Sequence, residues 1–236
     1  QRIDIVRGLA IVIIVINHLS QAIRYYGLKG REIPTPTAYG YSSAAELFVI
    51  VSGYMIGLTR VSKPDAIHKV IKRAGELYIY NWVLLLGITP FVYGISEKDA
   101  IFWRTSTLAD DPFGAIIEFG LNIYAPRLLD VLQLYIILLL VTPIAIVIWR
   151  KSPVMLLIVS AAVYFIGHAN NVLAIWQAVE VFHFNPLTWQ LLFFGSLILG
   201  ARRAHTRLFS FFERPGGRYY TASLTVIAIV CGLAKQ

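Results

Sequence analysis

Long apolar runs separated by short polar segments make up most of the chain. Seven of them are long enough to be candidate membrane spans, at about 5–23, 44–61, 76–94, 128–149, 153–169, 187–201 and 218–234. A helix needs about 20 predominantly apolar residues to cross a bilayer. The pattern therefore predicts an all-α, polytopic integral membrane helix bundle. No internal repeat or linker interrupts it, so one domain is expected over residues 1–236.

Composition and charge support this prediction. Hydrophobic residues make up 57% of the chain and charged residues 14%, whereas a soluble domain carries about a quarter charged residues. In a membrane protein, Lys and Arg mark cytoplasmic loops rather than nucleic-acid contacts. With the N-terminus inside, 14 of the 21 Lys and Arg residues fall in inner segments and 7 in outer ones. A cytoplasmic N-terminus is therefore expected.

The longest loop, 94–130, is then outside the membrane. Within it, residues 112–124 are expected to form an interfacial or re-entrant helix. Residues 174–184, in the next outer segment, are expected to form another. The chain begins at Gln1 rather than Met and ends just after an apolar run. It is therefore expected to be part of a longer protein.

The first span, VRGLAIVIIVINHL, carries two ionisable groups in an otherwise apolar run. Arg7 and His18 are eleven residues apart, which on a helix is roughly 20° past three turns and about 16 Å along the axis. Asp4 precedes Arg7 by three residues and can pair with it. Arg7 is also explained by snorkelling to the interface, and His18 by a hydrogen bond to a neighbouring helix. Ionisable groups inside a span usually mark a functional site.

Glu46 lies near the outer end of the second span. Antiparallel packing of the first two spans would place it at a depth similar to that of His18, where a carboxylate can orient an imidazole. It is equally explained as an interface residue facing water. Gly53 and Gly57 form a GxxxG pair, which mostly indicates close helix packing.

Lys69, Lys72 and Arg73 cluster before the third span. The positive-inside rule explains them, and so would a phosphate-binding site. No Walker loop, Rossmann glycine turn, CxxC or HExxH pattern is present in the sequence, so no metal site is predicted.

Several stretches together resemble a known family. IDIVRGLAIVIIVINH, with its Arg, ten residues and His, is similar to the opening of the membrane O-acyltransferase superfamily, and AELFVIVSGYMIG and IKRAGELY resemble its second and third helices. A closer resemblance is to the OpgC family, the inner-membrane proteins that succinylate osmoregulated periplasmic glucans. It rests on Glu46 in AELF, APRLLDVLQLYIILLLVTP (125–143) and FNPLTWQLLFFGSLILG (184–200). That family has more spans than the seven found here.

The resemblance implies transfer of an acyl group from a cytoplasmic acyl-CoA to a hydroxyl of a periplasmic glucan. The acyl donor would be succinyl-CoA, with acetyl-CoA as the alternative, and no cofactor would be bound permanently. His18 would act as general base with Glu46 orienting it, and Arg7 would hold an anionic part of the donor. Lys69, Lys72 and Arg73 would contact the donor phosphates. The protein would lie in the bacterial inner membrane.

A second tier of candidates is expected to contact the acceptor or support the site: Asp4, Arg127, Asp130, Trp189 and Gln190. Arg127 is one candidate for the cation that a succinyl carboxylate would need. Arg127 and Asp130 are also explained as helix-end charges, and Trp189 as an interface anchor rather than a sugar-stacking platform.

Three alternatives remain open from the sequence. One is an O-acetyltransferase acting on another envelope polysaccharide. The second is a proton-coupled transporter or flippase, since intramembrane His and Glu also serve pumps. The third is a membrane scaffold, which would leave the Asp4, Arg7 and His18 stripe unexplained.

Overall fold

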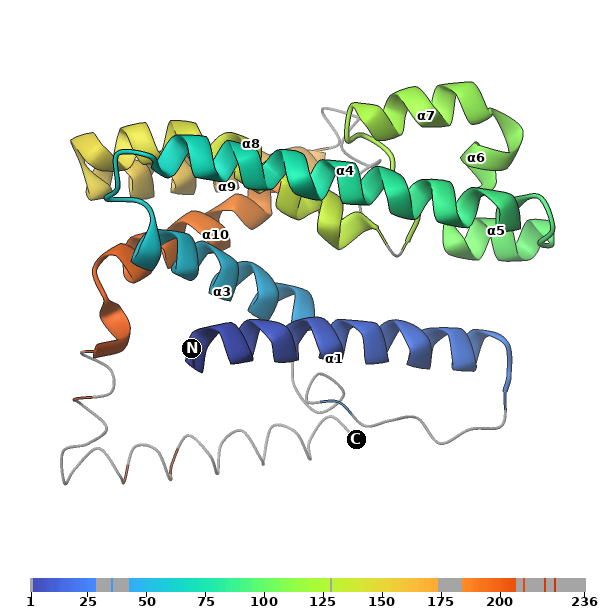
Figure 1. Ribbon diagram of the computed structural model, residues 1–236, viewed down its shortest axis with the longest axis horizontal. Helices are drawn as coiled ribbons and strands as arrows, with labels where there is room; N and C mark the ends of the chain where they lie inside the picture. The colour runs from blue at the N-terminus through green and yellow to red at the C-terminus, as the bar shows by residue number, and fades with distance from the viewer. Residues whose placement is uncertain are drawn as a thin grey trace. The chain divides into compact units, whose positions relative to one another are not determined.

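The computed structural model describes residues 2–28, 35, 43–127, 129–173, 184–206, 210, 219 and 223. Every regular element in these ranges is a helix, which confirms the all-α prediction. The helices are α1 (Arg2–Tyr25), α3 (Ala44–Thr59), α4 (Ala66–Val92), α5 (Glu97–Trp103), α6 (Ser106–Asp110), α7 (Pro112–Gly120), α8 (Asp130–Lys151), α9 (Pro153–Leu173) and α10 (Pro186–Ala201) (Figure 1).

Six of the seven predicted spans are helical. Three segments are long and apolar enough to cross a membrane, namely Gly8–Tyr25, Ala66–Val92 and Asp130–Lys151, and three shorter apolar helices accompany them at Ala44–Thr59, Pro153–Ala169 and Pro186–Ala201. These helices indicate a membrane protein. The predicted span at 218–234 lies outside the described residues apart from positions 219 and 223.

The chain divides into two compact units. The first comprises residues 1–61 and 195–236. In it, α3 packs against α1 (Figure 1). The α3 helix also approaches the end of α10 closely, because a Cβ on Gly57 would collide with the backbone of Leu197, and a Cβ on Gly200 with the backbone of Tyr54. The GxxxG prediction of close packing therefore holds for Gly57.

The second unit comprises residues 62–194. Here α4 runs alongside α8, and α9 packs on α8 (Figure 1). A hydrophobic cluster at the C-terminal end of α4 joins it to the segment that precedes α8; its buried members are Leu85, Val92, Leu108, Ala115, Phe119, Tyr124, Ala125 and Leu129.

The segment between α4 and α8 folds into three short helices, two of which begin at a side-chain cap. Ser96 caps α5 by accepting a hydrogen bond from the Asp99 N–H (3.2 Å), and Asp111 caps α7 by accepting one from the Gly114 N–H (3.0 Å). The helix expected within 112–124 is therefore present as α7, and α5 and α6 were not expected. Residues 174–183 of the other expected interfacial helix lie outside the described part.

Packing on α4 holds α7 in place. The Tyr78 hydroxyl on α4 donates to the Gly120 carbonyl (2.8 Å), and Trp82 meets Phe119 edge to face with ring centroids 5.0 Å apart. Aromatic pairs of this geometry contribute about 0.5–1.5 kcal/mol beyond their burial.

Candidate functional site

Helix α1 carries the predicted catalytic stripe. It is continuous from Arg2 to Tyr25, so positions 4, 7 and 18 lie on one face, as their spacing predicts. The His18 side chain is half-buried. Beside it in the sequence, the Asn17 amide oxygen accepts a hydrogen bond from the Thr35 hydroxyl (2.6 Å). The side chains of Asp4 and Arg7 lie outside the described part.

Glu46 is the third residue of α3 and completes its capping box. Its Oε2 accepts a hydrogen bond from the Ser43 N–H (3.2 Å), and the Ser43 hydroxyl accepts one from the Glu46 N–H (3.3 Å). This arrangement satisfies two donors at the start of the helix and fixes the carboxylate. Within the described residues Oε1 has no hydrogen-bond partner, so capping uses one oxygen of the group. The pairing of Glu46 with His18 stays a prediction.

The predicted donor-binding cations lie on the first turns of α4, in the second unit. Lys69 forms an ion pair with Asp65 (2.5 Å), in which both side chains are exposed, and Arg73 pairs with Glu76 (3.3 Å). The hydrogen bond from Lys69 lowers the pKa of Asp65. Lys72 is exposed and has no carboxylate partner among the described residues. It is therefore the cation of this trio most available to an incoming anion.

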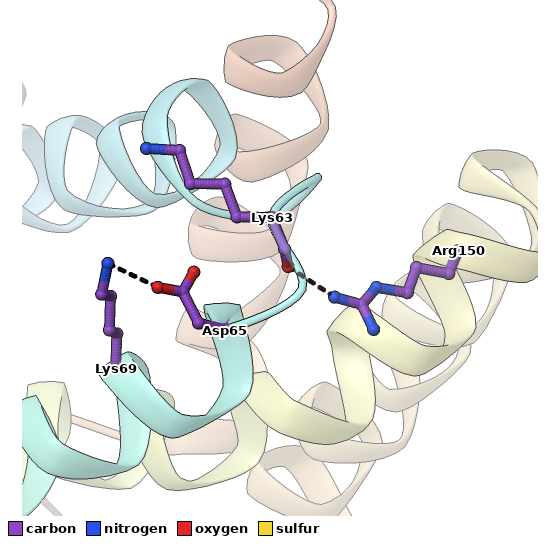
Figure 2. Close-up of polar contacts among 4 residues, drawn as sticks. All are labelled: Lys63, Asp65, Lys69 and Arg150. Atoms are coloured by element: carbon purple, nitrogen blue, oxygen red, sulfur yellow. Dashed lines mark hydrogen bonds and ion pairs between the residues drawn. The ribbon is translucent and has the colours of Figure 1, made fainter.

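A further cation adjoins this cluster. The Arg150 guanidinium, at the end of α8, donates a hydrogen bond to the Lys63 carbonyl oxygen (2.7 Å). Figure 2 shows the Lys63 ammonium pointing away from that contact, while Lys69 reaches toward Asp65. The sequence alone does not connect Arg150 with the cations of α4. Its position follows from the antiparallel course of α4 and α8, which brings the start of one to the end of the other.

The second-tier residues Arg127 and Asp130 lie before and at the start of α8. The Arg127 guanidinium carbon is 4.4 Å from the centroid of the Phe102 ring, and its backbone N–H donates to the Trp103 carbonyl (3.0 Å). Asp130 is 8% exposed, and its Oδ1 accepts a hydrogen bond from the Val131 N–H (2.8 Å). Both residues are therefore partly removed from water rather than free at a helix end.

Trp189 and Gln190 lie in the first two turns of α10. Trp189 packs edge to face on Phe184, with ring centroids 5.0 Å apart. The Gln190 amide is buried and hydrogen-bonds to Ser160 of α9. Gln190 therefore links two helices, which its position in the sequence alone does not reveal.

A further polar contact was not predicted. In the first unit the Tyr54 hydroxyl lies 2.5 Å from Nδ1 of His205 and accepts a hydrogen bond from the His205 N–H (3.1 Å). No local pattern identifies this pair, because the two residues are 151 positions apart in the sequence. In the described part of the chain, no group of three or more His, Cys, Asp or Glu side chains could hold a metal ion.

Comparison with known families agrees with this architecture. The model of the OpgC protein family matches residues 1–236. The chain belongs to the OpgC protein family. No curated protein and no solved structure matches it. Membership of the OpgC family bears out the sequence resemblance, while the Arg-x10-His motif and the roles assigned to single residues stay predictions.

Proposed function

We propose that this OpgC family protein is a membrane acyltransferase. It would move an acyl group, succinyl by preference, from a cytoplasmic acyl-CoA to a hydroxyl of a periplasmic glucan. The observation that carries the proposal is the family match over residues 1–236. Apolar helices long enough to span a bilayer also support it. A protein that crosses the membrane can reach a donor on one side and an acceptor on the other.

In the proposed reaction His18 is the general base. Its imidazole takes the proton from the acceptor hydroxyl as that oxygen attacks the thioester carbonyl carbon. The C–S bond then breaks, CoA leaves as the thiolate, and the proton passes to the sulfur. Histidine suits this role because its ordinary pKa lies near neutrality.

Glu46 would orient the imidazole of His18. The packing of α1 against α3 supports this role, and the capping box holds the carboxylate at one oxygen while leaving Oε1 for a second interaction. A carboxylate so placed also stabilises the imidazolium formed during proton transfer. Arg7, on the same face of α1, would hold an anionic part of the donor.

Lys69, Lys72 and Arg73 would bind the phosphates of the donor. Ammonium and guanidinium groups form strong, charge-assisted hydrogen bonds with phosphate. Because Lys69 and Arg73 already have carboxylate partners, Lys72 is expected to make the largest contribution.

The decisive experiment uses the full-length protein in lipid nanodiscs with succinyl-CoA or acetyl-CoA and a glucan acceptor. Release of the CoA thiol and the mass gain of the glucan are followed together. We expect transfer by the wild type and a loss of about 10²–10⁴-fold in His18→Ala, the range typical of a general base. His168→Ala serves as the control, because His168 is an exposed histidine on α9 with no role in the proposed reaction.

The donor site is tested with a truncated substrate. Lys72→Gln should raise KM for acyl-CoA and leave KM for the corresponding acyl-pantetheine, which lacks the phosphates, unchanged. Absence of thiol release and of transfer by any form would overturn the proposal in favour of a transporter or flippase. A mass gain that corresponds to acetyl rather than succinyl would support acyl transfer but identify acetyl-CoA as the donor.

A further inference from the structure

The second unit contains an apolar cavity at the C-terminal end of α4. Its volume is about 220 Å³. It lies between the last turns of α4, the segment that joins α5 to α6, and the segment that follows α7. Its lining residues are Ile88, Phe91, Val92, Ile95, Trp103, Thr105, Pro126 and Arg127. Most of these walls are hydrocarbon or aromatic. Such walls suit a hydrocarbon chain and offer few partners for the hydroxyls of a sugar.

Arg127 is the charged residue of the lining. Its side chain is half-buried, and the contact with the Phe102 ring, 4.4 Å from the guanidinium carbon, restricts its position. Within the described ranges the guanidinium has no carboxylate at ion-pair distance. The charge of Asp130 acts on it only from beyond that distance. The N–H donors of the guanidinium therefore have room for an anion at the edge of the apolar cavity.

The length of α4 indicates how deep in a bilayer the cavity would lie, and therefore which anions could reach it. Helix α4 has 27 residues, and its first turns carry Lys69, Lys72 and Arg73. The remainder, from Ala74 to Val92, is about 28 Å long, which is close to the thickness of the hydrocarbon core. The end of α4, and with it the cavity, therefore falls where acyl chains meet head groups.

We propose that this cavity binds an anionic phospholipid, with one acyl chain between α4 and Trp103 and the phosphate on Arg127. Arg binds phosphate oxygens in a bidentate manner, and phospholipid is the phosphate compound present at this depth. In the predicted topology the lipid belongs to the outer leaflet. The inference goes beyond acyl transfer and does not depend on it.

The fluorescence of Trp103 provides the test. Full-length protein is reconstituted in phosphatidylcholine vesicles that contain either phosphatidylglycerol brominated on its acyl chains or the same proportion of brominated phosphatidylcholine. The signal of Trp103 is the difference between wild type and Trp103→Phe. We expect the brominated phosphatidylglycerol to quench this signal several-fold more than the brominated phosphatidylcholine does.

Arg127→Gln should abolish the excess quenching, and Arg127→Lys should retain part of it. Lys98→Gln removes an exposed cation from the same segment and should leave the excess unchanged. Equal quenching of Trp103 by the two lipids in the wild type would overturn the proposal. So would an excess that persists in Arg127→Gln, or one that a soluble glucan displaces, since the last result would assign the cavity to the acceptor.

Discussion

Gln190 and Ser160 hydrogen-bond to each other twice across the contact between α9 and α10. The Ser160 hydroxyl donates to Oε1 of Gln190 (2.7 Å), and Nε2 of Gln190 donates to the Ser160 carbonyl (2.7 Å). Both side chains are buried. The Gln190 amide also donates to the Leu187 carbonyl of its own helix (3.1 Å). Both ends of this amide are therefore hydrogen-bonded, and two of its three bonds join α10 to α9.

Breaking this pair should destabilise the bundle. Gln190→Leu removes the acceptor of the Ser160 hydroxyl, and a buried polar group left without a partner costs about 1–3 kcal/mol. Ser160→Ala should cost less, because the carbonyl bond remains. A double-mutant cycle, measured by reversible unfolding in mixed micelles, should give a coupling of about 0.5–1 kcal/mol. Strict additivity of the two substitutions would contradict the reciprocal pairing.

Gly57 should not tolerate a methyl group. A Cβ at this position would overlap the backbone carbonyl of Leu197, which cannot move away as a flexible side chain could. We expect Gly57→Ala to cost about 1–3 kcal/mol, as overpacking typically does, and to lower the melting temperature of the purified protein.

Gly75→Ala is the matched control for that experiment. A Cβ on Gly75 would meet nothing within 4 Å, so the substitution should be neutral or stabilise α4 by up to about 1 kcal/mol through helix propensity. Equal effects of the two substitutions would show that the close approach of α3 to α10 is absent.

The sequence predicted which segments are helical better than it predicted where each helix begins. Helix α4 begins at Ala66, ten residues before the expected span at 76–94. The apolar run identifies only the part that lipid surrounds, whereas backbone hydrogen bonding continues through the charged turns of IHKVIKRAGE. Helices α5 and α6 are too short for a periodic signal. The side-chain cap of α5 at Ser96 is recognisable mainly once the structure is known, and α6 begins without one.

The side-chain contacts that the sequence did not predict join segments that are distant along the chain. The spacing of Arg7 and His18 placed both on one face of α1 because a helix fixes that relation locally. The partners of Gln190, Tyr54 and Arg150 depend instead on which helices meet, and one sequence carries no direct record of that. Glu46 was predicted as a partner of His18. Its role in capping α3 agrees with the local Ser-x-x-Glu pattern at 43–46, which is typical of a capping box.

Tyr124 should make stability fall at alkaline pH. Burial raises the pKa of Tyr124 to about 12. The positive charge of Arg104 lowers this pKa in part, and the negative charge of Glu118 raises it slightly. In the unfolded chain tyrosine titrates near pH 10, so between about pH 10 and 12 the unfolded state loses a proton that the folded state keeps. The stability that Tyr124 confers is therefore complete below pH 10 and is lost as pH rises toward 12.

This prediction is checked by unfolding between pH 9 and 12. The wild type should lose more stability over that interval than Tyr124→Phe, whereas Tyr93→Phe, which alters an exposed tyrosine, should follow the wild type. At neutral pH Tyr124→Phe should cost about 1–2 kcal/mol, because the Tyr124 hydroxyl donates to the Arg104 carbonyl (2.6 Å). Parallel pH profiles for all three proteins would contradict the raised pKa.

The topology predicts opposite accessibility for two exposed lysines. Cys231, the one cysteine of this sequence, is first changed to Ser so that it does not react. In that background Lys98→Cys on α5 should react with a membrane-impermeant maleimide in spheroplasts, since its loop is expected outside. Lys72→Cys on α4 should react only after the membrane is permeabilised. The reverse pattern would place the N-terminus outside and move the cationic cluster away from a cytoplasmic donor.

Acyl transfer that depends on His18 is the central claim, and its most direct test is made on the product. Periplasmic glycans are isolated from cells that express the full-length gene as wild type, His18→Ala or His168→Ala, and their masses are compared. We predict a succinyl mass gain with the wild type and with His168→Ala that is absent with His18→Ala, when membranes contain equal amounts of each protein. A full mass gain with His18→Ala would contradict the assignment of the base, and the absence of any gain with the wild type would contradict glycan acylation itself.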